Sequence, residues 1–299
     1  MKRAILTLGL LVPALILSAC GGQQRESDSL DDPRIVVLGG SVAETVVGLG
    51  AADFIVARDD SSVYPDTLLN WPSVGYFRMI GAEAVLSVNP TLILADAAAG
   101  PEAALQQLES TGIRVVRLPG GPSPDDIERQ VRAIADELDR EERADALIED
   151  MRSDLAAADQ VVEESGREPR VLLALGQDGG ALTFAGSGTN ADEFFRLAGA
   201  DNVFGEADGY KPMSSEAIVE ANPEIVVLLG RTVQSFGGVE NIAARPEMRG
   251  IQPRFVVLPD EALGFGPSLG EFVLDFACRI HMPEDGSRLS ACAHVNVEI

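Results

Sequence analysis

GYFRMIGAEAVLSVNPTLILA, residues 75–95, decides the fold because its pattern occurs a second time further along the chain. Residues 209–229 read GYKPMSSEAIVEANPEIVVLL. Both stretches open with Gly-Tyr and a nearby basic residue, pass through Glu-Ala and Asn-Pro, and end in an apolar run. The matching letters of 83–90 and 216–223 fall in the same register. The repetition predicts two copies of one structural unit.

The similarity extends beyond these two stretches. Residues 43–56 align with residues 191–204 at a constant offset. In the first half, short apolar runs alternate with helical patterns, which is typical of strands and helices around a parallel sheet. Ser41 and Glu44 are predicted to form a capping box that opens a helix ending at Leu49. The other predicted elements are strands at 34–39, 54–57, 91–95 and 113–118, and helices at 82–88 and 101–110.

Residues 123–165 differ in composition from the preceding part of the chain. After Pro124 this region contains neither Gly nor Pro, and its apolar residues recur with a helical period. We expect two helices with a break near Asp139, and the second, about 22 residues long, would span roughly 33 Å. Strand and helix signals restart at residues 170–176. The predicted fold is α/β, with two Rossmann-like lobes (34–139 and 166–299), parallel-type sheets and a single long bridging helix (140–165). A parallel α/β enzyme with a coincidental internal resemblance is the alternative.

The N-terminus has the features of an export signal. Lys2 and Arg3 precede an apolar run that is short for a membrane span and is interrupted by Pro13. The run ends in LSAC, which resembles the lipobox of bacterial lipoproteins, so residues 1–19 are expected to be a signal peptide and Cys20 the lipidated residue. The polar residues 20–33 would then form a flexible tether that holds the folded protein at a bacterial membrane. A chance cysteine after the apolar run is the alternative.

Charge and cysteine content narrow the function further. The net charge is -24, and it becomes -26 without Lys2 and Arg3, which excludes a general nucleic-acid binder. The acidity suits solubility in a secreted protein, although a basic partner would also fit. Cys278 and Cys292 lie close together in the sequence, and in an exported protein they most simply form a disulfide; two unpaired thiols are the alternative.

Together, the signal, the lipobox, the two α/β lobes and the linking helix resemble a substrate-binding protein of a bacterial ABC importer. The resemblance is to the rigid-helix type that handles iron siderophores, haem and cobalamin. It covers essentially the whole mature chain, and LGGSVAETVVGLGAADFIVARDDSSVYP with the later SVGYFR is similar to the hemin-binding branch. The resemblance implies a monomer that captures hemin between its lobes and delivers it to a permease dimer with its ATPase, with haem as cargo and no catalytic cofactor.

The resemblance also implies a docking role for the repeated glutamates. In this superfamily one glutamate on each lobe docks into arginine pockets of the permease, and by motif position these are Glu83 and Glu216. A symmetric permease dimer would need two matching anionic groups, which a repeated sequence supplies. Taken one at a time, each could equally be a solvated glutamate in the first turn of a helix.

The tyrosines are the candidate ligands of ferric haem. A phenolate oxygen is a hard ligand that suits ferric iron, and Tyr76 in GYFR is the predicted iron ligand. Arg78 would stabilise the phenolate or pair with a propionate. The remaining predicted ligand contacts are Tyr210, Lys211, Tyr64 and Arg58. A Tyr-Arg pair that merely caps a loop is the alternative.

Two features depart from the hemin-binding pattern. Some members of that branch pair Tyr with a second, histidine ligand, whereas His281 and His294 lie near the C-terminus; Tyr210, Met213 or water are the remaining candidates. In addition, Ser268 follows Gly-Pro where we expect Arg. A ferric-siderophore or cobalamin binder therefore remains open, as does an extracytoplasmic α/β enzyme. The sequence contains no G-x-S-x-G, H-E-x-x-H or zinc-ligand spacing, so we predict that the protein is not an enzyme.

Overall fold

The computed structural model describes residues 33–176, 180–282, 289–293 and 295. The predicted signal peptide, the lipidation site Cys20, the tether up to residue 32 and His294 lie outside these residues. Within the described part of the chain, no helix is both long enough and apolar enough to cross a membrane.

The first sheet contains all four strands predicted for the first half. Its order is β2-β1-β3-β4, and every neighbouring pair is parallel. Strands β1 and β3 are buried along their whole length, as expected for a parallel sheet covered on both faces. The elements of this half are β1 (Ile35–Leu38), α1 (Gly40–Gly48), η1 (Ala52–Phe54), β2 (Ile55–Arg58), η2 (Asp66–Asn70), η3 (Phe77–Met79), α2 (Ala82–Leu86), β3 (Leu92–Ala95), α3 (Glu102–Ser110) and β4 (Arg114–Arg117), where η denotes a 3₁₀ helix.

The second sheet is mixed. Strands β10, β9 and β5 are parallel neighbours, β6 and β8 extend the sheet in antiparallel fashion, and β7 pairs in parallel with β5. The elements of this half are β5 (Arg170–Leu175), β6 (Thr183–Ala185), α6 (Asn190–Leu197), β7 (Asp201–Asn202), β8 (Tyr210–Lys211), α7 (Ser215–Ala221), β9 (Ile225–Leu229), α8 (Gly230–Phe236), α9 (Val239–Ala243), η4 (Pro246–Met248), β10 (Arg254–Leu258), η5 (Asp260–Leu263), α10 (Leu269–Ile280) and η6 (Ser290–Cys292).

The repeated sequence forms the same unit twice, a short helix followed by an inner strand. Helix α2 leads to β3, and α7 leads to β9, with each strand flanked by two neighbours in its sheet. The repeated Asn-Pro lies at or just after the end of each helix: Asn222 caps α7, whereas Asn89 lies three residues beyond Leu86, the last residue of α2. Asn89 and Asn222 have φ angles of 49° and 42°, a left-handed conformation that Asn tolerates and that stops a helix. The proline that follows cannot continue the helix.

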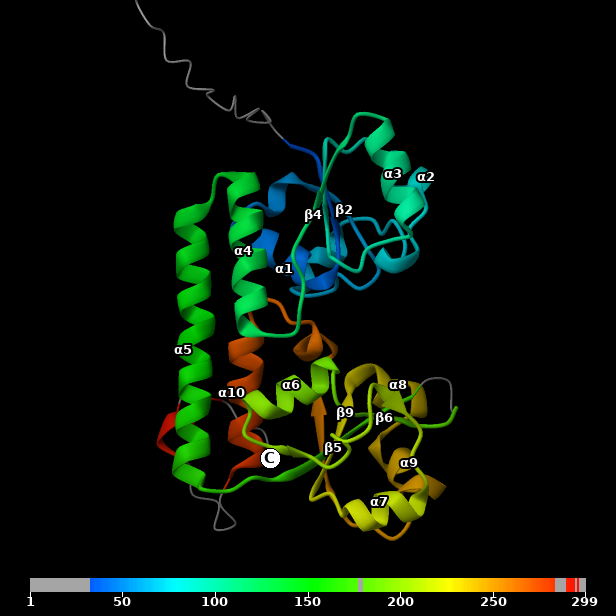
Figure 1. The fold of residues 1–299 in the computed structure, drawn as a ribbon, viewed down its shortest axis with the longest axis vertical. Helices are drawn as coiled ribbons and strands as arrows, with labels where there is room; N and C mark the ends of the chain where they lie inside the picture. Colours follow the sequence, from blue (N-terminus) through cyan, green and yellow to red (C-terminus); the bar gives the residue numbers. More distant parts are fainter. Residues whose placement is uncertain (1–32, 177–179, 283–288, 294, 296–299) are drawn as a thin grey trace, which may run out of the picture. The chain divides into compact units, whose positions relative to one another are not determined.

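Two helices connect the two halves of the chain, as the composition and helical period of residues 123–165 predict. Helices α4 (Pro124–Leu138) and α5 (Glu141–Ser165) are separated at Asp139, whose φ angle is 53°. The 25 residues of α5 give a length of about 37 Å. Helix α10 runs alongside α5 (Figure 1), and a side chain at Gly270 would approach the carbonyl oxygen of Met151 to 2.4 Å. This close helix contact therefore requires glycine.

The hydrophobic core is continuous across the bridge. Ile35 and Val37 of β1 belong to the same buried cluster as Met151 of α5, Val171 of β5 and Phe276 of α10. Alternate residues of β1 and β5 point to separate clusters on the opposite faces of the two sheets. The structure confirms the predicted α/β fold with two lobes. Residues 33–299 form one unit by their contacts, so lobe boundaries at residues 139 and 165 remain predictions.

One local prediction is wrong. Ser41 and Glu44 do not form a capping box, because the residue before α1 is Gly39 and no side chain caps that helix. The carboxylate of Glu44 instead accepts a hydrogen bond from the backbone N–H of Ser268, 224 residues away in sequence. At the other end of α10, Cys278 forms a disulfide with Cys292.

Candidate functional site

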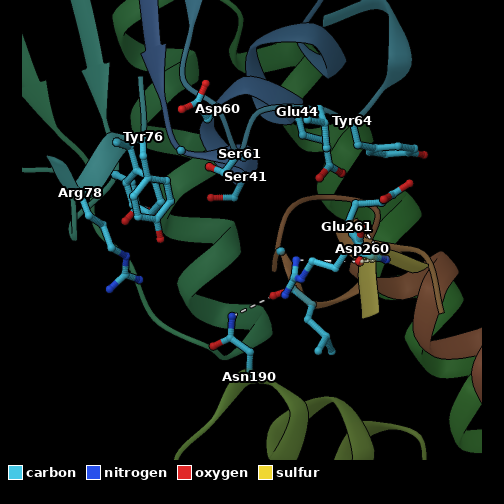
Figure 2. Close-up of a pocket in the computed structure, with 18 of the residues that line it drawn as sticks. Ser41, Glu44, Asp60, Ser61, Tyr64, Tyr76, Arg78, Asn190, Asp260 and Glu261 are labelled. Carbon is cyan, nitrogen blue, oxygen red and sulfur yellow. Dashed lines mark hydrogen bonds and ion pairs between the residues drawn. The ribbon is translucent and has the colours of Figure 1, made fainter. Parts of the chain in front are cut away.

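A cavity of about 810 Å³ lies where the carboxyl ends of strands from both sheets meet. Its first wall includes residues that follow β1, β2 and β3. Its second wall includes the end of β5, residues that follow β9 and β10, Asn190 at the start of α6 and Tyr210 of β8. Carboxyl ends of strands are the usual ligand-binding edge of open α/β sheets. Figure 2 shows side chains that line the cavity. The position of the cavity therefore follows from the strand topology.

All three tyrosines line this cavity. Tyr64 and Tyr76 come from loops of the first lobe, and Tyr210 comes from β8 of the second lobe. Tyr76 and Tyr210 are 44% and 47% exposed, so part of each ring is open to solvent. The structure therefore places phenol groups from both lobes in one cavity.

Arg78 also lines the cavity, close to Tyr76. The two residues flank Phe77: the Tyr76 ring lies edge-on to the Phe77 ring, and the Arg78 guanidinium stands 5.2 Å from the centre of the same ring. Tyr76 is extended, but Arg78 lies in the single turn η3 rather than in an extended loop. Within the described residues the guanidinium has no hydrogen-bonding or ion-pair partner. It is therefore available to an anionic group in the cavity.

Two predicted ligand contacts do not line the cavity. The guanidinium of Arg58 donates hydrogen bonds to the backbone carbonyls of Leu68 and Asp59 and supports the loop between them. Lys211 is exposed on β8, next to Tyr210, but is not among the lining residues. Adjacent residues of a strand point to opposite faces, which explains why Tyr210 and Lys211 separate.

The second lobe contributes a cation that the sequence analysis missed. Arg231 lines the cavity at the start of α8, and its backbone N–H donates to both carboxylate oxygens of Asp260, at 3.1 and 3.2 Å. Its guanidinium stands 3.9 Å from Asp260, a loose ion pair. Arg231 is the second residue after β9, and its location at a strand's carboxyl end was the available signal.

Carboxyl groups outnumber cations in the lining. Arg78 and Arg231 are accompanied by five acidic residues, namely Glu44, Asp60, Asp96, Asp260 and Glu261. Several of these have partners within the protein: Asp60 accepts from Ser73, and Asp96 accepts from the backbone of Ala98. The pKa of Glu44 is raised to about 7, chiefly by burial and also by the charges of Glu271 and Glu261, although hydrogen bonds from Ser268 lower it.

The surroundings disfavour the phenolate form of two tyrosines. Burial raises the pKa of Tyr64, and the nearby carboxylates of Glu271, Glu44 and Glu261 also raise it. Burial likewise raises the pKa of Tyr210, against the opposing effects of a hydrogen bond with Thr189 and the charge of Arg231. A cation or metal in the cavity would have to overcome these effects to ionise either group.

The repeated glutamates lie outside the cavity lining. Glu83 is in the first turn of α2, and Glu216 occupies the same place in α7; both are exposed. Hydrogen bonds with its own backbone N–H and with Ser214 lower the pKa of Glu216. The two carboxylates therefore occupy equivalent positions in the two copies of the repeated unit.

Comparisons with known proteins agree with this architecture. A periplasmic binding protein family model matches residues 35–253. An uncharacterized ABC transporter substrate-binding lipoprotein of Bacillus subtilis, YvrC, is 26% identical over 94% of this chain and 98% of its own length. The vitamin B12-binding protein of Photorhabdus laumondii is 26% identical over 66% of this chain and 70% of its own.

Two solved structures are more similar in sequence. The periplasmic heme-binding protein RhuT from Roseiflexus sp. RS-1 is 31% identical, with a TM-score of 0.75 over 82% of this chain and 97% of its own. The periplasmic heme-binding protein BhuT, in complex with two hemes, is 33% identical, with a TM-score of 0.76 over 83% and 98%. These relatives are substrate-binding transport proteins rather than enzymes. The chain belongs to the periplasmic binding protein family.

Proposed function

We propose that this protein captures hemin in the cavity between its lobes and delivers it to an ABC permease. The observation that carries the proposal is the guanidinium of Arg78 beside Tyr76 at the cavity wall, which has no hydrogen-bonding or ion-pair partner among the described residues. A volume of about 810 Å³ lies within the usual range of roughly 300–1,000 Å³ for small-molecule sites. The similarity to heme-binding structures supports the same ligand.

Tyr76 is the proposed ligand of the ferric iron. Ferric iron is a hard acid, and a phenolate oxygen is a suitable hard ligand. Partial burial opposes ionisation of both Tyr64 and Tyr210, and the carboxylates around Tyr64 add to the effect there. Arg78 would stabilise the Tyr76 phenolate or pair with a propionate, and Arg231 would offer a second cation from the opposite wall. Tyr210 and Tyr64 would then make secondary contacts.

Delivery requires three further features, which remain proposals. Export and lipidation at Cys20 would hold the protein at a membrane, as the name of the lipoprotein relative supports. Glu83 and Glu216, exposed at equivalent positions, would dock onto basic pockets of the permease dimer. A monomer with two pseudo-equivalent lobes would match the two halves of that dimer.

Cobalamin is the second candidate ligand, because five acidic residues but only two arginines line the cavity. Hemin carries two propionates, which such a lining accommodates only near Arg78 and Arg231. The amide groups of cobalamin would instead donate hydrogen bonds to carboxylates. The similarity to a vitamin B12-binding protein supports this candidate.

A titration of the purified protein with hemin, cyanocobalamin and a panel of ferric siderophores tests the proposal. We expect saturable hemin binding with a tyrosinate-to-iron charge-transfer band, and much weaker binding of the other ligands. Preferential binding of cyanocobalamin would establish the second candidate. Binding of a siderophore alone would refute both.

A further inference from the structure

Asp59 is a buried carboxylate held entirely by neutral donors. Its side chain is fully buried. One carboxylate oxygen accepts from the backbone N–H of Gly39 at 3.0 Å and from the hydroxyl of Ser62. The other oxygen accepts from the N–H and the hydroxyl of Ser61, at 2.8 and 2.6 Å, and from the N–H of Phe77 at 3.4 Å.

Such a group needs this many donors. A buried carboxylate is costly unless hydrogen bonds or opposite charges compensate for the water it loses. Within the described residues, the hydrogen-bonding partners of Asp59 are N–H and O–H groups rather than cations. Gly39 immediately precedes α1, so the positive end of that helix's dipole adds to the compensation. All five donors therefore point at one carboxylate.

The donors of Asp59 belong to three separate segments that line the cavity. These segments are residues 39–41 after β1, residues 60–64 after β2, and residues 76–78, which include Tyr76 and Arg78. A backbone hydrogen bond also joins the second segment to the third, since the N–H of Asp60 donates to the carbonyl of Gly75 at 3.0 Å. Asp59 thus lies behind the first wall of the cavity and connects its parts.

The two facing tyrosines differ in how they are held. Tyr210 belongs to β8, which pairs with β6 through Ala185, so the sheet itself fixes its backbone. Tyr76 lies outside any strand, and its neighbour Phe77 is held by loop contacts: its N–H donates to Asp59 at 3.4 Å, and its carbonyl accepts from the N–H of Gly100 at 2.8 Å. The position of Tyr76 therefore depends on hydrogen bonds between loops, including the one to Asp59, whereas the position of Tyr210 depends on strand pairing.

We propose that Asp59 is a positioning residue that sets Tyr76 and Arg78 at the cavity wall by holding the three segments together. Its consequence for hemin rests on the proposed function, whereas the positioning itself is a property of the ligand-free protein. The two can be tested separately.

The ligand-free test is amide hydrogen exchange of the full folded chain. Asp59→Asn keeps the size of the side chain but turns an N–H₂ group toward the donors, which leaves some of them unsatisfied. We expect faster exchange in peptides covering residues 39–41, 60–64 and 75–79, and unchanged exchange around residues 185–187 and 209–211. Asp53→Asn is the matched control, because Asp53 is exposed in η1. Unchanged exchange in the three segments would overturn the proposal.

Ser62→Ala provides a milder variant. It removes a single donor from the fully buried Ser62 and should accelerate exchange in the same segments, to a smaller degree. If Asp59→Asn does not fold, this variant decides the matter alone. Exchange that stays unchanged in it, or increases equally in both lobes, would count against Asp59 as a local organiser.

The ligand test uses the hemin spectrum. Asp59→Asn, compared with Asp53→Asn, should weaken hemin binding by about tenfold or more, as expected when hydrogen bonds to a charged group are lost. It should also shift or weaken the tyrosinate charge-transfer band. An unchanged band and affinity, despite faster exchange, would refute the effect on Tyr76. If the wild-type protein binds no hemin, the proposed function fails, and the exchange experiment still decides the positioning role.

Discussion

The carboxylate of Glu44 accepts a hydrogen bond from the backbone N–H of Ser268 at a distance of 2.6 Å. This bond joins α1 of the first lobe to the residue that precedes α10. Gly266 makes room for it, since a side chain there would come within 2.0 Å of the second carboxylate oxygen. Tyr64 packs against Phe272 nearby, with ring centres 5.6 Å apart. The two lobes are therefore in direct contact at this end of the cavity.

The contact predicts a dependence of stability on pH. Burial raises the pKa of Glu44 from 4.5 to about 7, so the folded protein holds a proton that the unfolded chain releases. Its stabilising contribution is complete below pH 4.5 and is lost as the pH rises towards 7. The loss would amount to at most about 3 kcal/mol. Glu44→Gln should remove this pH-dependent loss of stability. Urea unfolding at pH 5 and pH 8 measures it.

The control for this experiment is Glu149→Gln, which changes an exposed carboxylate on α5. We expect Glu149→Gln to keep the pH dependence of the wild type. Glu44→Gln, in contrast, should be more stable than the wild type at pH 8 but not at pH 5. Equal stability differences at both pH values would show that Glu44 does not titrate in this range.

Tyr76→Phe should have the largest effect on hemin among the three tyrosine substitutions. It removes the proposed ligand oxygen but leaves the ring in contact with Phe77. We expect the charge-transfer band to disappear and the affinity to fall well beyond the effect of Tyr64→Phe. Absorption spectra of the three complexes, with Tyr210→Phe as the third, provide the measurement. If the band survives in Tyr76→Phe and vanishes in Tyr210→Phe, the iron ligand is on the opposite wall.

The sequence was sufficient for much of the architecture, because that part is encoded locally, but it did not predict the antiparallel strands β6 and β8 of the second sheet. Apolar runs gave the four strands of the first sheet, and the duplicated stretch gave one copy of the same unit in each lobe. The helix break at Asp139 also followed from local composition. These features depend on backbone preferences and on burial of whole segments, which leave a pattern in consecutive residues.

The sequence was less informative about side chains whose partners are distant. Glu44 looked like half of a capping box, but its carboxylate accepts a hydrogen bond from a backbone N–H that is 224 positions away. Arg58 looked like a ligand contact, but nearby carbonyls occupy its guanidinium. Arg231 carried no motif at all. Such roles depend on the tertiary arrangement, which repeats and periodicity do not describe.

Arg231→Gln tests whether the second wall contributes a cation to hemin binding. The guanidinium is half-exposed and only loosely paired with Asp260, so its attraction for a propionate is expected to be modest, about 1 kcal/mol or roughly fivefold in affinity. The effect should shrink as the salt concentration rises. Arg249→Gln, at an exposed position away from the cavity lining, is the control for net charge. If Arg231→Gln does not weaken hemin binding at low salt, Arg231 is not part of the proposed site.

The final prediction concerns delivery to the permease. Glu83 and Glu216 are exposed, lie in the first turns of α2 and α7, and are absent from the cavity lining. Their joint replacement by Lys should therefore leave hemin affinity unchanged while abolishing stimulation of the transporter's ATPase, because like charges would face its basic pockets. Each single replacement should cause an intermediate loss. Replacing Glu149 and Glu240 by Lys changes the net charge equally at other exposed positions and should preserve stimulation. Full stimulation by the Glu83/Glu216 double variant would show that the permease binds elsewhere.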